Sequence, residues 1–391
     1  MAWFFRWGIK KQKKEWSYYM KIAIDALPLL GHAGGKVFLQ QLINALFDYD
    51  KDNEYNLVFR KYNLDLKKYR LKFTNQNNIK IDKILMPNRI MEYFWTFNEF
   101  NFLKGDTLYN NSDIFLSLLY FFPIFKKTKT VSILYDITTL KIDEYGSHKK
   151  EFMIRMNNLI KRSDKIVAIS EFTKKDFCQY FNYPERNVDV VYPTVDLSFK
   201  VLDRNKVENM IKKYNLNFRE YFIYVGNISY HKNIDRLITA FLKLKYNGKK
   251  LVLCGRTNWG KNIVDRIRKD KISDKVMLLE NVNDEDLPFL YNGSISLCYV
   301  SLYEGFGLPI LEAMKCGRPV IVSNLTSMPE VVSDAGITVN PYDETEIASK
   351  MEEILNIEKN EYYSRKSLER ANFFDQKKLA LSMIDIFNKV V

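Results

Sequence analysis

Short apolar runs alternate with amphipathic segments along most of the chain. Runs such as 221–225 (YFIYV) and 250–254 (KLVLC) have the pattern of strands that are buried in a parallel sheet. Segments between such runs, for example 37–47, 234–244 and 344–355, have helical periodicity. Further strands are predicted at 21–30, 55–60, 79–85, 130–135, 164–169, 188–192, 276–279, 294–300 and 329–332, and further helices at 171–181, 284–291, 309–316 and 377–391.

The alternation of strands and helices in both halves predicts the α/β fold class. We expect two doubly wound parallel-sheet (Rossmann-like) domains that face each other across a cleft. The expected boundaries are an N-terminal extension over 1–19, a first domain over 20–193, a second domain over 194–372 and a C-terminal helix over 373–391. A chain of 391 residues is long enough for two such cores.

The most informative stretch is 303–320, which reads YEGFGLPILEAMKCGRPV. It follows the predicted strand 294–300 and carries a glycine-rich turn and then a helix, for which Pro309 suits the start and Gly317 the end. The N-terminus of this helix then lies at the carboxyl end of a strand, with free backbone N–H groups facing the crevice. Such a helix end is an anion site, and phosphate is its usual occupant.

Two glutamates, Glu304 and Glu312, flank the turn. A carboxylate beside a diphosphate is repelled, so these side chains need another role. Glu312 lies one turn into the helix, and helical side chains lean toward the N-terminus, so it can accept from the vicinal hydroxyls of a ribose. Glu304 lies on the loop, where it can meet a hexose hydroxyl or a developing positive charge. Glutamates at this spacing also occur as ordinary solvated side chains.

The same stretch resembles the signature of the family-4 retaining glycosyltransferases of GT-B architecture, Glu, seven residues, Glu, in an EGFGLPxLEAM setting. The resemblance implies an N-terminal acceptor-binding domain, a C-terminal nucleotide-sugar-binding domain, and a last helix that packs back on the first domain. It also implies that Glu312 binds the nucleotide ribose and that Glu304 is catalytic and contacts the donor sugar. The backbone N–H groups expected to meet sugar and phosphate oxygens are those of Gly305, Phe306, Gly307 and Leu308.

Two loops of the first half join the site through this resemblance. Gly34 and Gly35 lie at a strand-to-helix turn, where backbone can approach a phosphate closely, and the family's loop there contacts the donor. The strand 130–135 leads into Asp136, where the family typically has His-Asp. Tyr135 replaces the histidine, which leaves room for a sugar that lacks a 6-hydroxyl. Asp136 is expected to help shape the catalytic site, with a turn cap as the alternative role.

Three loops of the second half complete the expected site. The segment 225–233 matches the family's VGxxxxxKN pattern, and this resemblance makes Lys232 the catalytic cation expected to neutralise the departing diphosphate. Asn227, in the same loop, is a donor-binding candidate at a place where the family often has arginine. Strands 250–254 and 276–279 end in the same crevice, because open parallel sheets bind ligands at their carboxyl edges. The residues that follow them, Arg256 and Val282, are candidates for contacts with nucleotide phosphate and base.

The net charge indicates which partners to expect, and the cysteine content indicates the redox environment of the chain. A net charge of +13 favours anionic partners such as nucleic acid, acidic lipid or phosphorylated small molecules. Four cysteines without a close pair, and only three histidines, predict a reduced, cytosolic chain without a metal site. Because no groove-reading motif is present, no nucleic-acid partner is expected, and a basic nucleic-acid-binding protein is the alternative from another class.

Aromatic segments raise the question of lipid contact. Residues 1–19 mix aromatic and basic side chains, which suits either a membrane interface or a disordered extension. The block 114–125 is too short to cross a bilayer, and with the aromatic segment 88–104 it is expected to be buried strand and loop rather than a groove for a lipid-linked glycan. The expected location is the cytoplasm or the inner face of the membrane.

The predicted activity is retaining, metal-independent transfer of a hexose, such as mannose or rhamnose, from a GDP, UDP or dTDP sugar. The expected acceptor is a glycan or lipid-linked glycan in cell-surface polysaccharide or lipopolysaccharide synthesis, and no cofactor is expected. The family resemblance implies a front-face departure in which the leaving phosphate helps to deprotonate the acceptor. A sugar-nucleotide epimerase or a phosphorylase of GT-B fold remains the alternative.

Overall fold

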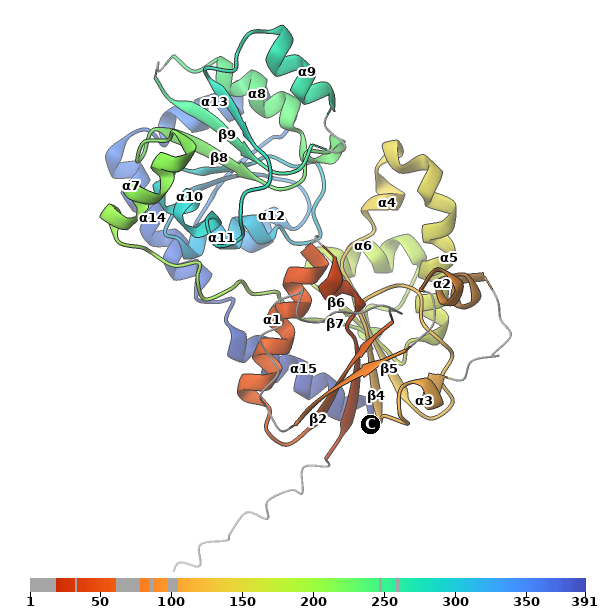
Figure 1. Cartoon of the computed structure of the whole chain (residues 1–391). Coiled ribbons are helices and arrows are strands. Elements are labelled where there is room, and N and C mark those ends of the chain that lie inside the picture. The colour runs from red at the N-terminus through yellow and green to blue at the C-terminus, as the bar shows by residue number, and fades with distance from the viewer. Residues whose placement is uncertain are drawn as a thin grey trace, which may run out of the picture.

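The computed structural model describes residues 19–31, 34–60, 78–84, 88–97, 105–245, 248–257 and 261–391. These residues form two parallel sheets with helices packed around each (Figure 1). The predicted α/β class with two doubly wound sheets is therefore confirmed. All but the last residue of the predicted extension 1–19, and the part of the aromatic segment at 98–104, lie outside the described residues.

The first sheet has seven parallel strands in the order β3-β2-β1-β4-β5-β6-β7. Its strands are β1 (Lys21–Asp25), β2 (Glu54–Phe59), β3 (Ile79–Lys83), β4 (Ile114–Ser117), β5 (Lys129–Leu134), β6 (Lys165–Ala168) and β7 (Val188–Val190). The helices of this half are α1 (Gly34–Tyr49), α2 (Asn88–Phe97), α3 (Gly105–Leu108), α4 (Thr138–Lys141), α5 (Gly146–Arg162) and α6 (Glu171–Phe181). The order of strands reverses between β1 and β4.

The second sheet has six parallel strands in the order β10-β9-β8-β11-β12-β13. Its strands are β8 (Tyr221–Val225), β9 (Lys250–Cys254), β10 (Val276–Leu279), β11 (Leu297–Tyr299), β12 (Val320–Ser323) and β13 (Ile337–Val339). The helices are α7 (Arg204–Ile211), α8 (Ile234–Leu242), α9 (Lys261–Lys269), α10 (Leu287–Gly293), α11 (Leu308–Lys315), α12 (Met328–Val332), α13 (Glu344–Glu353) and α14 (Ile357–Ala371). The order reverses between β8 and β11, so the loops after these two strands border the crevice where such folds bind ligands.

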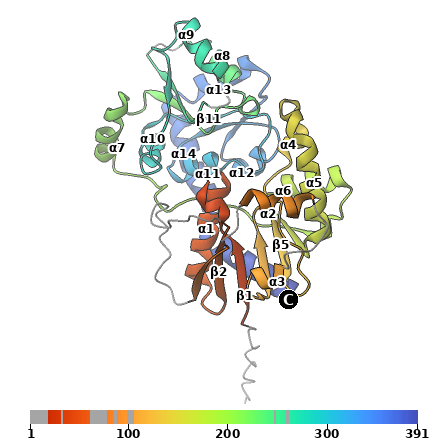
Figure 2. The same cartoon turned by 45° about the vertical axis from the view of Figure 1, so that its right-hand side comes forward.

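The last helix, α15 (Gln376–Val390), returns to the first half of the molecule and packs against α1 (Figures 1 and 2). Asp375 caps its N-terminus by accepting a hydrogen bond from the Lys378 backbone N–H at 2.9 Å. Its buried face is apolar and includes Leu379, Met383 and Phe387. This packing joins the C-terminus of the chain to the domain with which the chain begins.

One element of the second half was predicted wrongly. The segment Pro329–Val332, expected to be a strand, lies in helix α12, and the strands near it are β12 and β13. The segment is buried and rich in valine, so its composition does not distinguish a short strand from one turn of a buried helix. Pro329 near the first turn is the local feature that favours the helix.

The apolar block 114–125 begins as the buried strand β4 and continues without regular structure. Its residues Ile114, Phe115, Leu116, Leu118, Phe121 and Phe122 are buried, as expected for core rather than a lipid groove. The expectation was wrong for the described part of the aromatic segment, since Asn88–Phe97 forms the helix α2, on which Tyr93 and Phe94 are exposed. No helix in the described ranges combines the length and the apolar character that a membrane crossing requires.

Candidate functional site

The centre of the candidate site is an ion pair between Lys232 and Glu304. Lys232 ends the short turn Tyr230–Lys232 after β8, and Glu304 lies on the loop between β11 and α11. Their side chains meet with Nζ 2.6 Å from Oε1, and both are largely buried. Lys232 also donates to the Tyr299 hydroxyl at 3.1 Å. The topology explains the meeting, because these loops follow the two strands at which the order of the sheet reverses.

Both members of this pair are stabilised in their charged forms. Burial alone disfavours the Glu304 carboxylate, but Lys232 outweighs this effect and lowers the pKa of Glu304. Burial likewise disfavours the Lys232 ammonium, but the charge of Glu304 raises the pKa of Lys232 above its ordinary value. The pair therefore holds a positive and a negative charge at neutral pH, with both side chains largely buried.

Asp136 of the first domain approaches the same centre. Burial raises its pKa, and the charge of Glu304 adds to the rise while that of Lys232 opposes it. Its Oδ1 accepts a hydrogen bond from the Thr138 backbone N–H at 2.9 Å, which is the turn-capping role that the sequence allowed. Asp136 is thus both a cap and a neighbour of the Lys232–Glu304 pair.

The glycine at position 305 allows the two domains to approach closely. A Cβ at Gly305 would lie 2.2 Å from the Tyr135 carbonyl oxygen and 2.9 Å from Asp136 Cβ. The Gly305 carbonyl accepts hydrogen bonds from Ser170 Oγ at 2.6 Å and Thr173 Oγ1 at 3.0 Å. Ser170 Oγ also accepts from the Thr173 backbone N–H at 3.0 Å and so caps the N-terminus of α6. The first domain therefore orients the glycine-rich turn of the second.

A second contact between the domains was missed by sequence reasoning. Glu330 on α12 accepts hydrogen bonds from the backbone N–H groups of Glu171 at 2.8 Å and Phe172 at 3.0 Å, at the N-terminus of α6. It also accepts from the Tyr192 hydroxyl at 2.8 Å. A carboxylate at a helix N-terminus is favourable, because it meets unsatisfied donors and the positive end of the dipole. Nothing local in the sequence around Glu330 indicates this partner on the other domain.

The loop that carries Lys232 makes a third contact between the domains. The Tyr145 hydroxyl and His231 Nδ1 form a hydrogen bond of 2.8 Å. Burial lowers the pKa of His231 to about 4, and the neighbouring Lys232 adds to the effect, so the imidazole is neutral near pH 7. His231 therefore adds no charge to the centre and instead connects its loop to the first domain.

Beside this centre, a cavity of about 590 Å³ lies between the two halves. It brings together four predicted donor-binding residues of the second half, Asn227, Arg256, Val282 and Glu312. From the first half it is lined by α1, through Lys36, Val37, Gln40 and Gln41. The other predicted residues, among them Lys232, Glu304 and those of the glycine-rich turn, are not part of its lining.

Glu312 is an acidic residue of this cavity whose pKa is shifted by burial. Burial raises its pKa to about 7, although a hydrogen bond from Tyr291 opposes the rise. That bond joins the Tyr291 hydroxyl to Glu312 Oε2 at 2.7 Å. Tyr291 is fully buried on α10, and sequence reasoning did not select it because a buried tyrosine in a helix has no distinctive pattern. It holds one carboxylate oxygen of Glu312, a side chain that also lines the cavity.

Helix α11 begins where the glycine-rich turn ends. Gly307 precedes Leu308, the first residue of the helix, with φ of 96°, a conformation that strongly favours glycine. Phe306 points away from solvent and packs edge-on against Phe374, with 5.5 Å between the ring centroids. The ring is therefore directed into the core and leaves only the backbone of Phe306 for the predicted ligand contact.

The predicted residues of the first half lie around the start of α1. Gly34 is the first residue of this helix, and Gly35 follows it. A Cβ at Gly35 would lie 3.4 Å from the Tyr135 hydroxyl, so the two positions face each other. That hydroxyl is shielded from solvent and has no hydrogen-bond partner among the described residues. Burial raises the pKa of Tyr135 well above its ordinary value, which keeps the side chain neutral.

Solved structures with the same arrangement define the class of fold. The chain superimposes on Anabaena HepE in complex with UDP-glucose with a TM-score of 0.71, at 15% identity, over 95% of this chain and all of that one. It superimposes on WaaG, a glycosyltransferase of lipopolysaccharide biosynthesis, with a TM-score of 0.70 at 13% identity, over 94% of this chain and 99% of that one. The fold is GT-B, as the sequence predicted.

Family models identify the chain more closely. Residues 206–370 match the model of glycosyl transferases group 1, and residues 131–199 match that of glycosyltransferase family 4. The chain belongs to the group 1 and family 4 glycosyltransferases, and the resemblance found in the sequence is confirmed.

Curated relatives agree with this assignment. O-antigen chain mannosyltransferase B of Escherichia coli is 34% identical over 225 residues, which are 55% of this chain and 58% of the relative. O-antigen chain mannosyltransferase RfbU of Salmonella typhimurium is 28% identical over 228 residues, which are 58% of this chain and 61% of the relative. The match therefore spans about three-fifths of each of these relatives.

Proposed function

We propose that the protein transfers a hexose from a nucleotide diphosphate sugar to a glycan acceptor in the synthesis of lipopolysaccharide O-antigen. Mannose is the sugar best supported, because the two curated relatives named above are O-antigen mannosyltransferases. The observation that carries the proposal is the Lys232–Glu304 pair at the reversal point of the second sheet, beside a cavity that contains Glu312. A nucleotide sugar needs both parts, a reacting centre and a cavity for the nucleotide.

In this proposal the nucleotide occupies the cavity of about 590 Å³. Glu312 accepts hydrogen bonds from the ribose hydroxyls, while Arg256 and the Val282 backbone contact phosphate and base. Asn227 and the Gly34–Gly35 turn contribute to the diphosphate site from opposite domains. The N–H groups at the start of α11 face the phosphate oxygens, where the helix dipole favours negative charge.

The chemical step breaks the bond between the anomeric carbon and the phosphate oxygen and forms a bond from that carbon to an acceptor oxygen. Lys232 stabilises the negative charge that develops on the leaving diphosphate. Glu304 contacts the sugar and balances positive charge on its ring, and Asp136 and Tyr135 border the sugar from the first domain. The acceptor proton passes to the departing phosphate oxygen, so atoms and charge balance without a protein nucleophile.

We infer that the reaction retains the anomeric configuration and needs no metal ion. Attack on the face from which the phosphate leaves gives retention. Lys232 and the N–H groups of α11 supply the positive charge that a metal ion supplies elsewhere.

The test uses the full chain with GDP-mannose, UDP-glucose and a dTDP-hexose. Thermal shift identifies the donor that binds, and nuclear magnetic resonance of the product made on a defined oligosaccharide acceptor reports its anomeric configuration. We expect one of the donors to raise the melting temperature of the protein. We expect a donor whose anomeric bond is axial to give a product with an axial bond, and we expect EDTA to leave the rate of transfer unchanged. Absence of binding and turnover with every donor would exclude the proposal, an inverted product would exclude retention, and loss of activity in EDTA would exclude metal independence.

A further inference from the structure

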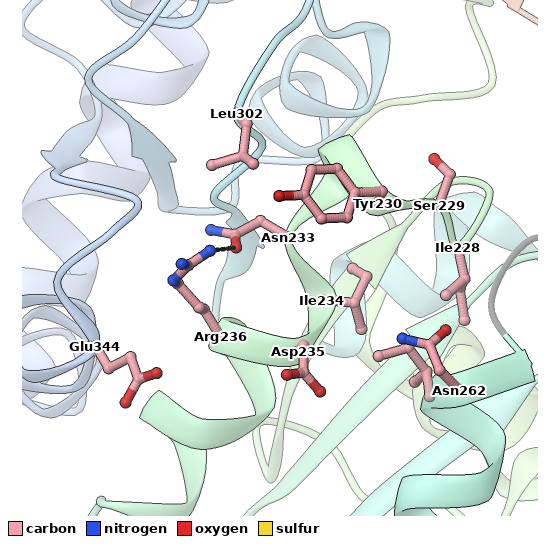
Figure 3. Close-up of a pocket in the computed structure, with 11 residues that line it drawn as sticks. Ile228, Ser229, Tyr230, Asn233, Ile234, Asp235, Arg236, Asn262, Leu302 and Glu344 are labelled. Carbon is pink, nitrogen blue, oxygen red and sulfur yellow. Dashed lines mark hydrogen bonds between the residues drawn. The ribbon is translucent and has the colours of Figure 1, made fainter. Parts of the chain in front are cut away.

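A second cavity, of about 470 Å³, lies in the second domain around the N-terminus of α8 (Figure 3). It is separate from the 590 Å³ cavity, with which it shares no lining residue. Its walls include Tyr230 and Leu302, which belong to the two loops that carry Lys232 and Glu304. These loops are joined directly, since the Leu302 backbone N–H donates to the His231 carbonyl at 2.7 Å. The second cavity therefore borders the loops that carry Lys232 and Glu304.

Both carboxylates in the lining of this cavity are paired with basic side chains. Asp235 forms an ion pair with Arg266 at 2.7 Å, and Glu344 forms one with Lys243 at 2.9 Å. Arg236 donates to Asn233 Oδ1 at 3.0 Å, a bond visible in Figure 3. The two carboxylates are therefore already neutralised, and the Arg236 guanidinium is engaged by the Asn233 amide and by the Tyr342 ring, whose centroid is 5.3 Å away. The cavity suits an uncharged ligand.

Polar and apolar groups are both present in the lining. Ile228, Ile234, Ile263 and Leu302 provide apolar surface. Ser229, Asn262, Asp235 and Glu344 add hydroxyl, amide and carboxylate groups, which can donate to or accept from a ligand hydroxyl. In Figure 3, Glu344 and Arg236 lie on one side of the cavity and Asn262 and Ile228 on the other. A ligand with many hydroxyls and an apolar face fits this mixture.

The lining also includes an aromatic ring, a group against which a sugar can pack. The Tyr230 side chain lines the cavity and is 58% exposed. The C–H face of a pyranose packs well against such a ring, and its hydroxyls then reach the polar groups around it. The volume of 470 Å³ falls within the range of about 300–1,000 Å³ that is typical of small-ligand sites.

We propose that this cavity binds a neutral oligosaccharide and holds a stretch of glycan chain close to the reaction centre. The binding itself does not depend on the proposed transfer activity. Its role, to keep a growing or acceptor chain near the enzyme, rests on the proposed function. Such a site adds affinity for long acceptors through effective concentration, without a new contact at the reacting hydroxyl.

The test measures binding of a panel of neutral tetrasaccharides, including α-mannotetraose and maltotetraose, to the full chain without donor. Saturation-transfer nuclear magnetic resonance detects binding, and calorimetry measures its affinity. The variants are Tyr230→Ala, which removes the ring, and Glu344→Gln, which keeps the size of the side chain but removes its charge. The matched control is Tyr49→Ala, because Tyr49 is also an exposed tyrosine, 46% exposed, at the end of α1.

We expect at least one tetrasaccharide to bind, and its affinity to fall at least about fivefold in Tyr230→Ala and measurably in Glu344→Gln, while Tyr49→Ala binds normally. Thermal shift by nucleotide sugar should remain unchanged in all three variants, which separates this site from the donor site. Absence of binding by the whole panel, or equal binding by wild type and Tyr230→Ala, would overturn the proposal. Neither result would affect the proposed transfer activity, which is tested by turnover of the donor.

Discussion

Lys232 Nζ lies 2.6 Å from Glu304 Oε1, and this ion pair joins the loops that leave the strands on either side of the reversal point of the second sheet. The side chains are 14% and 10% exposed, so each charge depends on the other for its stabilisation. Under the proposed function, the diphosphate of the donor competes with Glu304 for the ammonium group. The Lys232 ammonium is therefore already positioned to meet a negative charge, and Glu304 stabilises it until the ligand binds.

We predict that Lys232→Ala lowers the rate of transfer by a factor of about 100 to 1,000, because the charge on the leaving diphosphate loses its stabilising ammonium. Glu304→Gln should also remove most transfer, while leaving donor binding largely intact. Turnover of the bound nucleotide sugar measures both effects, and circular dichroism checks that the variants fold. Near-normal turnover in either variant would contradict the assignment of this pair to the reaction centre.

Tyr291→Phe tests the environment of Glu312. Burial raises the pKa of Glu312 to about 7, so in the ligand-free protein the side chain is protonated to a large extent near neutral pH. Ribose hydroxyls donate better to the carboxylate, so affinity for the nucleotide sugar should increase as pH rises through 7. Removal of the Tyr291 hydroxyl takes away a bond that favours the charged form, which should move the midpoint to higher pH and weaken binding at neutral pH about tenfold.

Calorimetric titration with the nucleotide sugar across this pH range measures the midpoint. Tyr221→Phe is the matched control, because the Tyr221 hydroxyl is also buried and donates to α10, at the Leu290 carbonyl, 2.6 Å away. Its loss should leave the midpoint unchanged. Identical pH profiles for wild type and Tyr291→Phe would show that Tyr291 does not position Glu312.

The raised pKa of Glu312 also has a consequence for folding. Between its ordinary value and about 7, the folded protein binds this proton more tightly than the unfolded chain does. The contribution of Glu312 to the free energy of unfolding therefore falls as pH rises through that interval. Replacement by Gln should abolish this contribution, so the stability of Glu312→Gln should fall less steeply over the same pH interval in denaturant titrations.

Gly305→Ala tests the contact between the domains. The added Cβ would lie 2.2 Å from the Tyr135 carbonyl oxygen, so the loop or the first domain must move. A displacement of about 1 Å, which would relieve this contact, costs about 100-fold in rate when it misplaces groups at the reaction centre. Gly146→Ala is the control, because no neighbouring atom lies within 4 Å of a Cβ at that position. Normal turnover in Gly305→Ala would show that the close approach of the domains is not needed for transfer.

Asp25→Ala tests the buried ion pair with Arg60 in the first domain. Both side chains are fully buried, and the Arg60 guanidinium lies 5.1 Å from the Trp95 ring centroid and 4.8 Å from that of Phe121. Loss of the carboxylate leaves an uncompensated guanidinium, which should lower the free energy of unfolding by about 3–5 kcal/mol in a denaturant titration. Asp385→Ala, which removes the exposed partner of Lys389, should have no measurable effect on that titration. Equal stabilities for the two variants would contradict this reasoning.

Much of the architecture follows from local pattern. The apolar runs and the helical periodicity are patterns among residues that are close together in the chain. The α/β class and most elements were therefore predicted correctly. The motif around Glu304 and the loop of Lys232 were recognisable for the same reason, because a glycine turn and a helix start have local sequence signals. The sequence alone therefore assigns both loops to the carboxyl edge of one sheet.

The partners of these residues were decided by the tertiary structure. Glu330 meets the N-terminus of α6 across the domain interface, and Tyr291 reaches Glu312 from another helix, at distances that no sequence spacing encodes. Pro329–Val332 lies in helix α12 although valine is enriched in strands, and its residues Val331 and Val332 are buried there. The chain thus carries the local conformational signals, whereas burial, hydrogen-bond partners and pKa shifts arise only when distant segments displace water from one another.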